Sequence, residues 1–187
     1  MVQYLKTMKA IESEGMPVTL EVILIVEDTY GGEFFKRVLQ ELNKSNFLPY
    51  KVKLKKLSGR RNPIHAPYLC NPKLKKIITA TDTANADRII LIYDGDGPSN
   101  YSQRFNQVKS HIPAKTNTPI KIVLFEYEVE EWICKSLDIK WDSKPSDALK
   151  RKVGYKKSQL PKYVSKVNFE DLSNSCKSFQ EFMDALR

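Results

Sequence analysis

Two aspartates in the segment IILIYDGDG, residues 89–97, have the type and spacing for chemistry on phosphate groups. Asp94 and Asp96 follow five residues that prefer burial, and a glycine stands after each of them. Carboxylates on so pliable a turn can hold a divalent cation, and the glycines allow a phosphate to approach the backbone closely. Asp-Gly is also a strong signal for a β-hairpin turn, which is the structural alternative.

The residues that follow suit neither a hairpin nor a calcium-binding loop. The segment 98–111 starts with proline and carries Tyr101, Phe105 and Val108 at helical spacing, so no second strand follows the turn. An EF-hand loop would need an oxygen ligand where Pro98 stands and a glutamate where Phe105 stands. We therefore interpret the two aspartates as lying on a turn between a strand and a helix.

Two further apolar segments also end in acidic residues. LEVILIV, residues 20–26, leads into Glu27 and Asp28. IKIVLF, residues 120–125, leads into four glutamates, which are Glu126, Glu128, Glu130 and Glu131. If the three strands are parallel neighbours, their carboxyl ends share one rim of the sheet, where open α/β sheets bind ligands. Oxygen ligands with so few histidines favour Mg²⁺ or Mn²⁺ over zinc.

Each acidic group also has a structural interpretation. Asp96 can cap the helix that starts near Pro98, and the glutamates at 128–131 can favour a first helical turn. Crowded carboxylates repel one another unless a cation is shared. The recurrence of acids at three strand ends therefore favours a shared site.

The pattern of apolar residues predicts the elements that position this rim. The three near-continuous aliphatic runs are typical of strands buried on both faces of a parallel sheet. Residues 50–57 alternate apolar side chains with lysines and predict a strand at a sheet edge. Amphipathic patterns predict helices over 33–42 and 73–81. This order predicts an α/β fold with a mostly parallel, Rossmann-like sheet flanked by helices.

Composition divides the chain of 187 residues into three segments. Residues 1–17 form an N-terminal extension, and residues 18–141 hold the α/β domain. Residues 142–187 lack a strong strand pattern, carry many lysines and end in the amphipathic sequence FQEFMDAL. We expect this last segment to be a basic helical extension that packs on the domain.

Charge and cysteine content limit the partners and the compartment. The formal net charge of +9 favours a polyanionic partner such as nucleic acid. Three widely spaced cysteines argue against a disulfide framework and against a zinc site. The apolar stretches are too short to span a membrane, and the first residues do not form a signal peptide. We expect a soluble cytoplasmic protein with no membrane partner.

The ordered motifs resemble the TOPRIM domain, the module shared by topoisomerases and primases. Its signature is a glutamate after the first strand and an Asp-x-Asp after a later one, matched by Glu27 and by Asp94-Gly95-Asp96. Small stand-alone members related to OLD-family nucleases are similar in three more places. These are the helix EFFKRVLQEL, the segment Glu128-Val129-Glu130-Glu131-Trp132, and a C-terminal Tyr-x-Lys region followed by a Phe-rich helix. The resemblance covers residues 20–187.

The resemblance implies Mg²⁺- or Mn²⁺-dependent chemistry on nucleic-acid phosphodiesters. Asp94 and Asp96 would hold the ion, and Glu27 would coordinate it or act as general acid-base. A second ion held with Glu128 or Glu130 would activate the attacking water.

Two positions depart from the family pattern. Asp28 stands where the family usually has glycine, so it either changes the turn or adds a ligand. The glutamate that follows the third strand stays open among Glu126, Glu128 and Glu130. The position of a second ion is open for the same reason.

Basic side chains that hold neighbouring phosphates should surround such an acidic centre. The candidates are Arg60 and Arg61 in a Gly-Arg-Arg loop, Lys150, Arg151 and Lys152, and Lys156 and Lys157. Trp132 and Tyr155 are interpreted as core aromatics.

Two other functions compete with a nuclease. The first is a catalytically inactive module that uses the same fold to bind nucleic acid or a partner protein such as an ATPase. The chain has no GxxxxGK[ST] loop, so work driven by ATP would need another chain. The second is a phosphotransfer receiver domain, which also clusters acids at strand ends but suits the Asp-Gly-Asp-Gly turn poorly.

Overall fold

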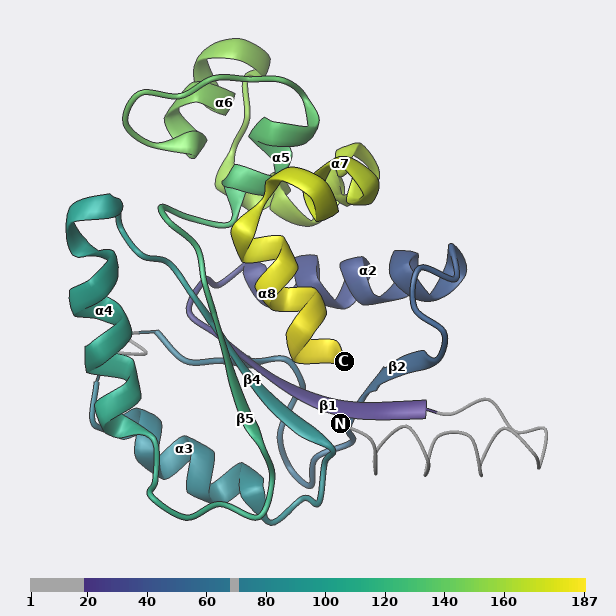
Figure 1. Cartoon of the computed structure of the whole chain (residues 1–187), viewed down its shortest axis with the longest axis vertical. Helices are drawn as coiled ribbons and strands as arrows, with labels where there is room; N and C mark the ends of the chain where they lie inside the picture. The colour runs from purple at the N-terminus through teal and green to yellow at the C-terminus, as the bar shows by residue number, and fades with distance from the viewer. Residues whose placement is uncertain (1–18, 68–70) are drawn as a thin grey trace.

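A parallel β-sheet lies between two layers of helices in the computed structural model, which describes residues 19–67 and 71–187 (Figure 1). The strands are β1 (Thr19–Val26), β2 (Lys51–Leu54), β3 (Ile64–His65), β4 (Arg88–Tyr93) and β5 (Ile120–Leu124). The helices are α2 (Gly31–Lys44), α3 (Lys73–Asp82), α4 (Pro98–His111), α5 (Glu130–Ser136), α6 (Pro145–Val153), the 3₁₀ helix η1 (Lys157–Lys166), α7 (Phe169–Ser175) and α8 (Lys177–Leu186). The predicted extension over residues 1–17 lies outside the described residues.

The strand order β2-β1-β4-β5 puts the three apolar runs side by side. These strands pair in parallel. Along β1, residues 19–22 pair with β2, and Ile25 and Val26 near its carboxyl end pair with β3. The register aligns Val26 with Ile92 and Ile92 with Val123. Since these residues lie near the carboxyl ends of their strands, the acidic segments that follow must leave the sheet at the same rim.

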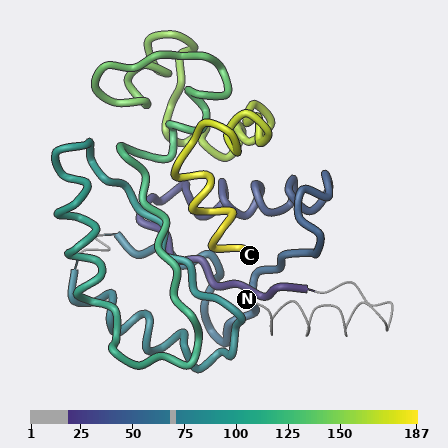
Figure 2. The backbone as a smooth tube through the Cα atoms, in the orientation of Figure 1, coloured from purple at the N-terminus to yellow at the C-terminus, as the bar shows by residue number. Residues whose placement is uncertain are grey.

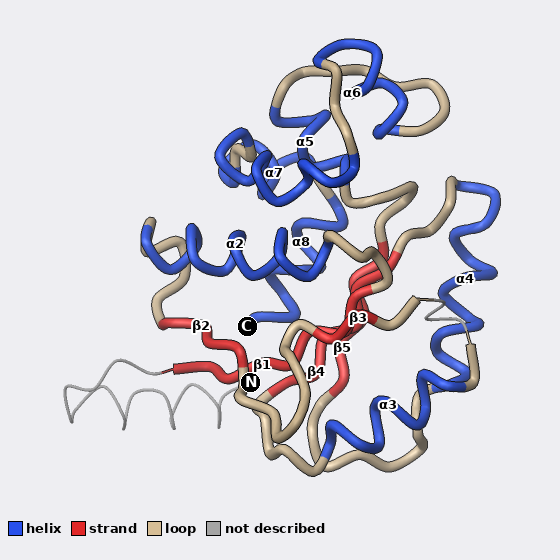
Figure 3. Tube along the Cα trace, turned by 180° about the vertical axis from the view of Figure 1, so that it is seen from behind, coloured by secondary structure: helices blue, strands red, loops and turns tan. Residues whose placement is uncertain are grey.

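Helices cover both faces of the sheet (Figure 3). Each face has its own hydrophobic core. Side chains alternate between the faces along β1, so Leu24 packs toward α2 and α8 while Ile25 packs toward α3 and α4. Residues 22–26 of β1 and 89–93 of β4 are all buried, which explains why these runs are continuously apolar.

The C-terminal segment is part of the larger core. Figure 2 shows it leaving the sheet and returning as α8, which runs beside β5. Phe179 and Phe182 lie 5.0 and 5.5 Å from Trp132 between ring centroids, and Phe182 lies 5.6 Å from Phe35 of α2. The interpretation of Trp132 as a packing residue is confirmed, since its side chain is fully buried.

The predicted α/β class and the order of its elements are confirmed, with shifts of a few residues at the ends. The edge strand predicted over 50–57 is shorter, at Lys51–Leu54. The short strand β3 is not among the elements predicted from the sequence, because two residues are too few to show a periodic pattern. Within the described residues, no helix is both long enough and apolar enough to cross a bilayer.

Candidate acidic site at the carboxyl ends of the strands

The rim predicted from the three strand ends forms in the structure. The Glu27 backbone donates to the Ile92 carbonyl at 3.1 Å, which continues the β1–β4 pairing past the end of β1. Its carboxylate accepts the backbone N–H of Asp94 at 3.2 Å. The ends of β1 and β4 therefore meet at this rim, with Glu27 next to Asp94.

The turn after β4 packs directly on the loop after β5. A side chain at Gly95 would place its Cβ 2.3 Å from the Phe125 carbonyl oxygen and 2.8 Å from that of Glu126. Asp96 and Gly97 have positive φ angles of 56° and 99°. The expectation that Gly95 leaves room for a phosphate is wrong, because the protein's own carbonyl groups occupy that space.

The structure also corrects the interpretation of Asp96 as a helix cap. Gly97 is the N-cap residue of α4, and no side chain caps this end. Asp96 instead donates its backbone N–H to the Tyr127 carbonyl at 3.2 Å, while its carboxylate stays about half exposed.

Arg104 of α4, which is not among the residues predicted from the sequence, holds one side of the rim. Its Nη2 lies 2.8 and 2.6 Å from the two carboxylate oxygens of Glu27, and its Nη1 lies 2.9 Å from Asp96. Its Nε donates to the Asp94 carbonyl at 2.6 Å. A usable signal existed, since Arg104 shares the inward stripe of its helix with Tyr101 and Val108.

Lys157 of η1 holds the other side of the rim. Its ammonium lies 2.9 Å from Asp28, 2.8 Å from Glu130 and 4.0 Å from Glu128. Burial lowers the pKa of Lys157, but the carboxylates of Glu130 and Asp28 outweigh it and raise the pKa above its usual value. Lys157 was predicted to contact phosphate from a basic surface, but the structure places it among the acids.

Two of the acids also serve the ends of helices. Asp28 accepts the backbone N–H groups of Tyr30 and Gly31 at 2.6 and 2.8 Å, at the start of α2. Glu128 accepts the N–H of Ser146 at 2.6 Å, at the start of α6. Both carboxylates lie at the positive end of a helix dipole, which stabilises their negative charge without a metal ion.

The four glutamates after β5 separate into two pairs. Glu128 and Glu130 face Lys157, and Glu130 is fully buried with the Tyr155 hydroxyl donating to it at 2.6 Å. Glu126 and Glu131 instead line a separate cavity. Of the three glutamates that the sequence left open, Glu128 and Glu130 therefore lie at the rim and Glu126 does not.

Asp94 differs from the other acids of the rim. Its carboxylate is partly buried and has no hydrogen bond or ion pair with any residue in the described ranges, although its backbone N–H and carbonyl are both bonded. Burial raises its pKa well above the usual value, and the nearby charges of Glu130, Glu27 and Glu128 raise it further, against an opposing effect of Lys157. A carboxylate in this position is costly unless a cation comes to it.

The donor atoms suit Mg²⁺ or Mn²⁺, but their arrangement is not a complete ligand set. In residues 19–67 and 71–187, no three His, Cys, Asp or Glu side chains are placed to hold a metal ion together. Arg104 and Lys157 stand between the carboxylates and neutralise them. The chemistry of the five predicted ligands fits a hard cation, and Asp94 is the carboxylate open to one.

The predicted phosphate-binding residues lie in different places. Lys150, Arg151 and Lys152 form the exposed last turn of α6, and Lys156 is exposed beside Lys157. Arg60 and Arg61 are also exposed. Arg60, however, lines a cavity with Thr81 and Ala84 at the end of α3, which leads into the start of β4. The Gly-Arg-Arg loop therefore lies toward the amino ends of the strands, away from the acids.

Comparison of the chain with protein-family models, with curated proteins and with solved structures gives no significant match. The geometry of the acidic rim is therefore the basis on which a function is inferred.

Proposed function

We propose that the protein is a Mg²⁺- or Mn²⁺-dependent phosphodiesterase of nucleic acid, of the TOPRIM nuclease type. The observation that carries the proposal is the Asp94 carboxylate. It has no partner among the described residues and lies near the carboxylates of Glu27, Glu128 and Glu130 at the carboxyl ends of parallel strands. Such a group lowers the stability of the fold and is retained most readily where it binds a cation.

The residues divide into two groups around Asp94. Glu27 and Asp96 flank it on the side of Arg104, and Glu128 and Glu130 flank it on the side of Lys157. A bound divalent ion would polarise the phosphoryl oxygen and stabilise charge on the leaving oxygen. Arg104 keeps Glu27 oriented toward Asp94, and Lys157 limits the repulsion between Glu130 and its neighbours.

The charge distribution supports a nucleic-acid substrate. The chain carries a formal charge of +9 although its candidate centre is acidic. Exposed cations on α6 and at Lys156 are available for phosphates that flank the cleaved one. Neutralising those phosphates contributes affinity that decreases as the salt concentration rises.

One observation favours the alternative of an inactive module that binds nucleic acid or a partner protein such as an ATPase. Arg104 and Lys157 already form ion pairs with Glu27, Asp96 and Glu130. A site that no longer binds metal would need such cations to neutralise its carboxylates. The two functions differ in whether a metal ion produces cleavage.

A cleavage assay with the full chain separates them. Supercoiled plasmid, single-stranded DNA and RNA are incubated with Mg²⁺, with Mn²⁺ or with EDTA, using wild type, Asp94→Asn and the exposed control Asp184→Asn. We expect metal-dependent cleavage that Asp94→Asn abolishes and Asp184→Asn leaves unchanged. Cleavage retained in Asp94→Asn would discredit the site, and no cleavage of any substrate would favour the inactive module.

A further inference from the structure

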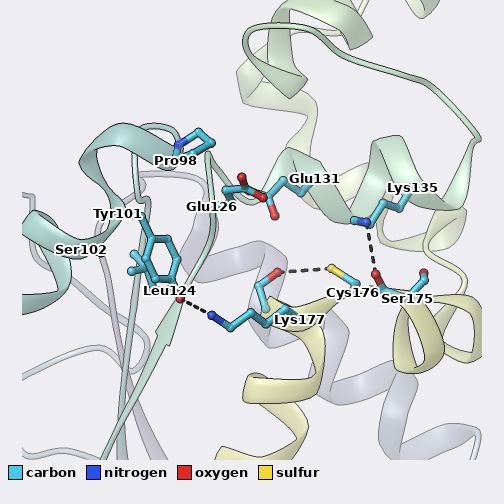
Figure 4. A pocket seen from close by; sticks show the side chains of 11 residues that line it. Pro98, Tyr101, Ser102, Leu124, Glu126, Glu131, Lys135, Ser175, Cys176 and Lys177 are labelled. Atoms are coloured by element: carbon cyan, nitrogen blue, oxygen red, sulfur yellow. Dashed lines mark hydrogen bonds between the residues drawn. The ribbon is translucent and has the colours of Figure 1, made fainter.

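A cavity of about 400 Å³ lies on the other side of the loop that carries the acidic rim. Figure 4 shows its walls, which come from the start of α4, the end of β5, α5 and the start of α8. The loop after β5 is shared, because Glu128 and Glu130 face the rim while Glu126 and Glu131 face the cavity. A ligand bound in the cavity would therefore lie close to a phosphate bound at Asp94.

The cavity has an acidic side, a basic side and an aromatic ring. Glu126 supplies a carboxylate, and Lys135 and Lys177 supply ammonium groups. The Glu131 carboxyl is buried and accepts the Tyr127 backbone N–H, and burial raises its pKa to about 7. The Lys177 ammonium lies 3.2 Å from the Tyr101 hydroxyl and 4.9 Å from the centre of its ring. Lys177 is also the first residue of α8, so the positive end of that helix dipole adds to the basic side.

The acidic, basic and aromatic groups together limit the chemical class of ligand that fits the cavity. A simple anion would leave the Glu126 carboxylate unused and would be repelled by it, and a polyamine would be repelled by the lysines. A nucleotide satisfies all three features, since its base has a flat apolar face and N–H donors, and its phosphate is an anion. The volume lies within the range of small-ligand sites and is too small for paired bases within a duplex.

We propose that this cavity binds one unpaired nucleotide of the substrate strand, with its phosphate at Lys177 and Lys135. The base lies by Glu126 and on the Tyr101 ring, where it replaces the exposed Lys177 ammonium, which turns to the phosphate. The proposal rests on the proposed function, because the acidic rim then acts on a phosphate next to this nucleotide. Single strands are bound in this way elsewhere, through stacking of splayed bases on aromatic side chains beside a basic groove. The preferred substrate is therefore single-stranded, or has a single-stranded end.

Fluorescence anisotropy of a labelled oligonucleotide tests the site in EDTA, where cleavage does not occur. We expect the single strand to bind more tightly than the matching duplex. Tyr101→Ala should weaken single-strand binding about tenfold through loss of stacking. Lys177→Ala should weaken it less, and should reduce the slope of log affinity against log salt concentration by about 0.7.

Two further variants control for folding and for general charge. Lys177 is largely exposed, so its replacement leaves the fold intact even if Tyr101→Ala does not. The exposed Lys76 of α3 lies outside the cavity, and Lys76→Ala should reduce single-strand binding less than Lys177→Ala. Wild-type single-strand affinity in both cavity variants, or equal losses for single strand and duplex, would overturn the proposal.

A competition arm distinguishes a strand from a free nucleotide. Nucleoside monophosphates in millimolar excess should displace the labelled strand only weakly, because they lack its flanking phosphates. A protein that bound the monophosphate and not the strand would refute the strand assignment. If the nucleotide site passes these tests while no cleavage occurs with any metal, the nuclease proposal fails and the binding site stands.

Discussion

At the scale of single residues, the rim is a balance between carboxylates and two internal cations. Arg104 and Lys157 pair with most of the acids, and Asp94 is left without a partner among the described residues. Partly buried ion pairs of this kind contribute little net stability, but removing one partner is expensive because the other charge stays behind. The substitutions that test the site are therefore those that change which carboxylate has no cation beside it.

Replacing Asp94 by asparagine should stabilise the protein in the absence of metal. Because the folded state raises the pKa of this carboxyl, ionisation costs stability once the pH passes the unfolded value. The gain of Asp94→Asn should be about 1 kcal/mol or more at pH 8 and should shrink as the pH falls toward 4. Urea unfolding in EDTA across this pH range measures it. A variant less stable than wild type at pH 8 would show that the carboxylate is not under strain.

Replacing Arg104 by glutamine should destabilise the protein by roughly 2–3 kcal/mol, because Glu27 and Asp96 lose their cation. Mn²⁺ should then raise the melting temperature of the variant more than that of wild type, since the freed carboxylates can bind it. The exposed pair of Arg37 and Glu33 offers a matched control, and Arg37→Gln should change stability by less than about 0.5 kcal/mol. Equal effects of both substitutions would contradict the structural role of Arg104.

At the scale of elements, the site depends on how the turn after β4 meets the loop after β5. Backbone bonds from Asp96 to Tyr127 and from Gly97 to Glu126, at 3.2 and 2.8 Å, join two segments about 30 residues apart in sequence. This junction separates Glu128 from Glu126 and so separates the rim from the cavity. The fit leaves no space for a side chain at Gly95.

Gly95→Ala should cost roughly 2–3 kcal/mol, because its Cβ would meet two backbone carbonyls that cannot move without shifting the loop. Gly32→Ala in α2 is the control, since its Cβ would make an ordinary contact of 3.5 Å with Pro63. Thermal unfolding of the two variants measures the difference. If Gly95→Ala melts like Gly32→Ala, the close approach of the two loops does not hold in solution.

At the scale of the whole molecule, the C-terminal segment completes both the core and the site. It supplies Phe179 and Phe182 to the cluster around Trp132, Lys157 to the rim and Lys177 to the cavity. The Tyr50 hydroxyl also donates to the Leu186 carbonyl at 2.6 Å, which ties the end of the chain to the segment before β2. Residues 142–187 therefore belong to the same folding unit as the sheet.

A chain that ends at residue 141 should fail to fold cooperatively, because Trp132 and Phe35 would lose the aromatic side chains that bury them. Near-ultraviolet circular dichroism and a urea melt check this expectation. Phe182→Ala in the full chain is a milder change and should lower the free energy of unfolding by about 3–5 kcal/mol. A truncated chain that retained the native spectrum and a sharp transition would show the segment to be an accessory.

The sequence alone determined the sheet and the acidic rim, because both follow from local patterns. Continuous apolar runs identify buried parallel strands, and parallel neighbours must end at one rim, so Glu27, Asp94 and Asp96 were predicted together. Neither prediction needed knowledge of which side chains pair across the fold. The metal and the activity stay predictions.

Only the tertiary structure decided how the charges pair and where the later glutamates point. Arg104 and Lys157 reach the rim from segments whose distance in space no local pattern encodes. The same holds for Arg60, which local composition grouped with the other cations although the loop lies toward the opposite ends of the strands. Local periodicity specifies burial, whereas the partner of a charged side chain depends on contacts between segments remote in sequence.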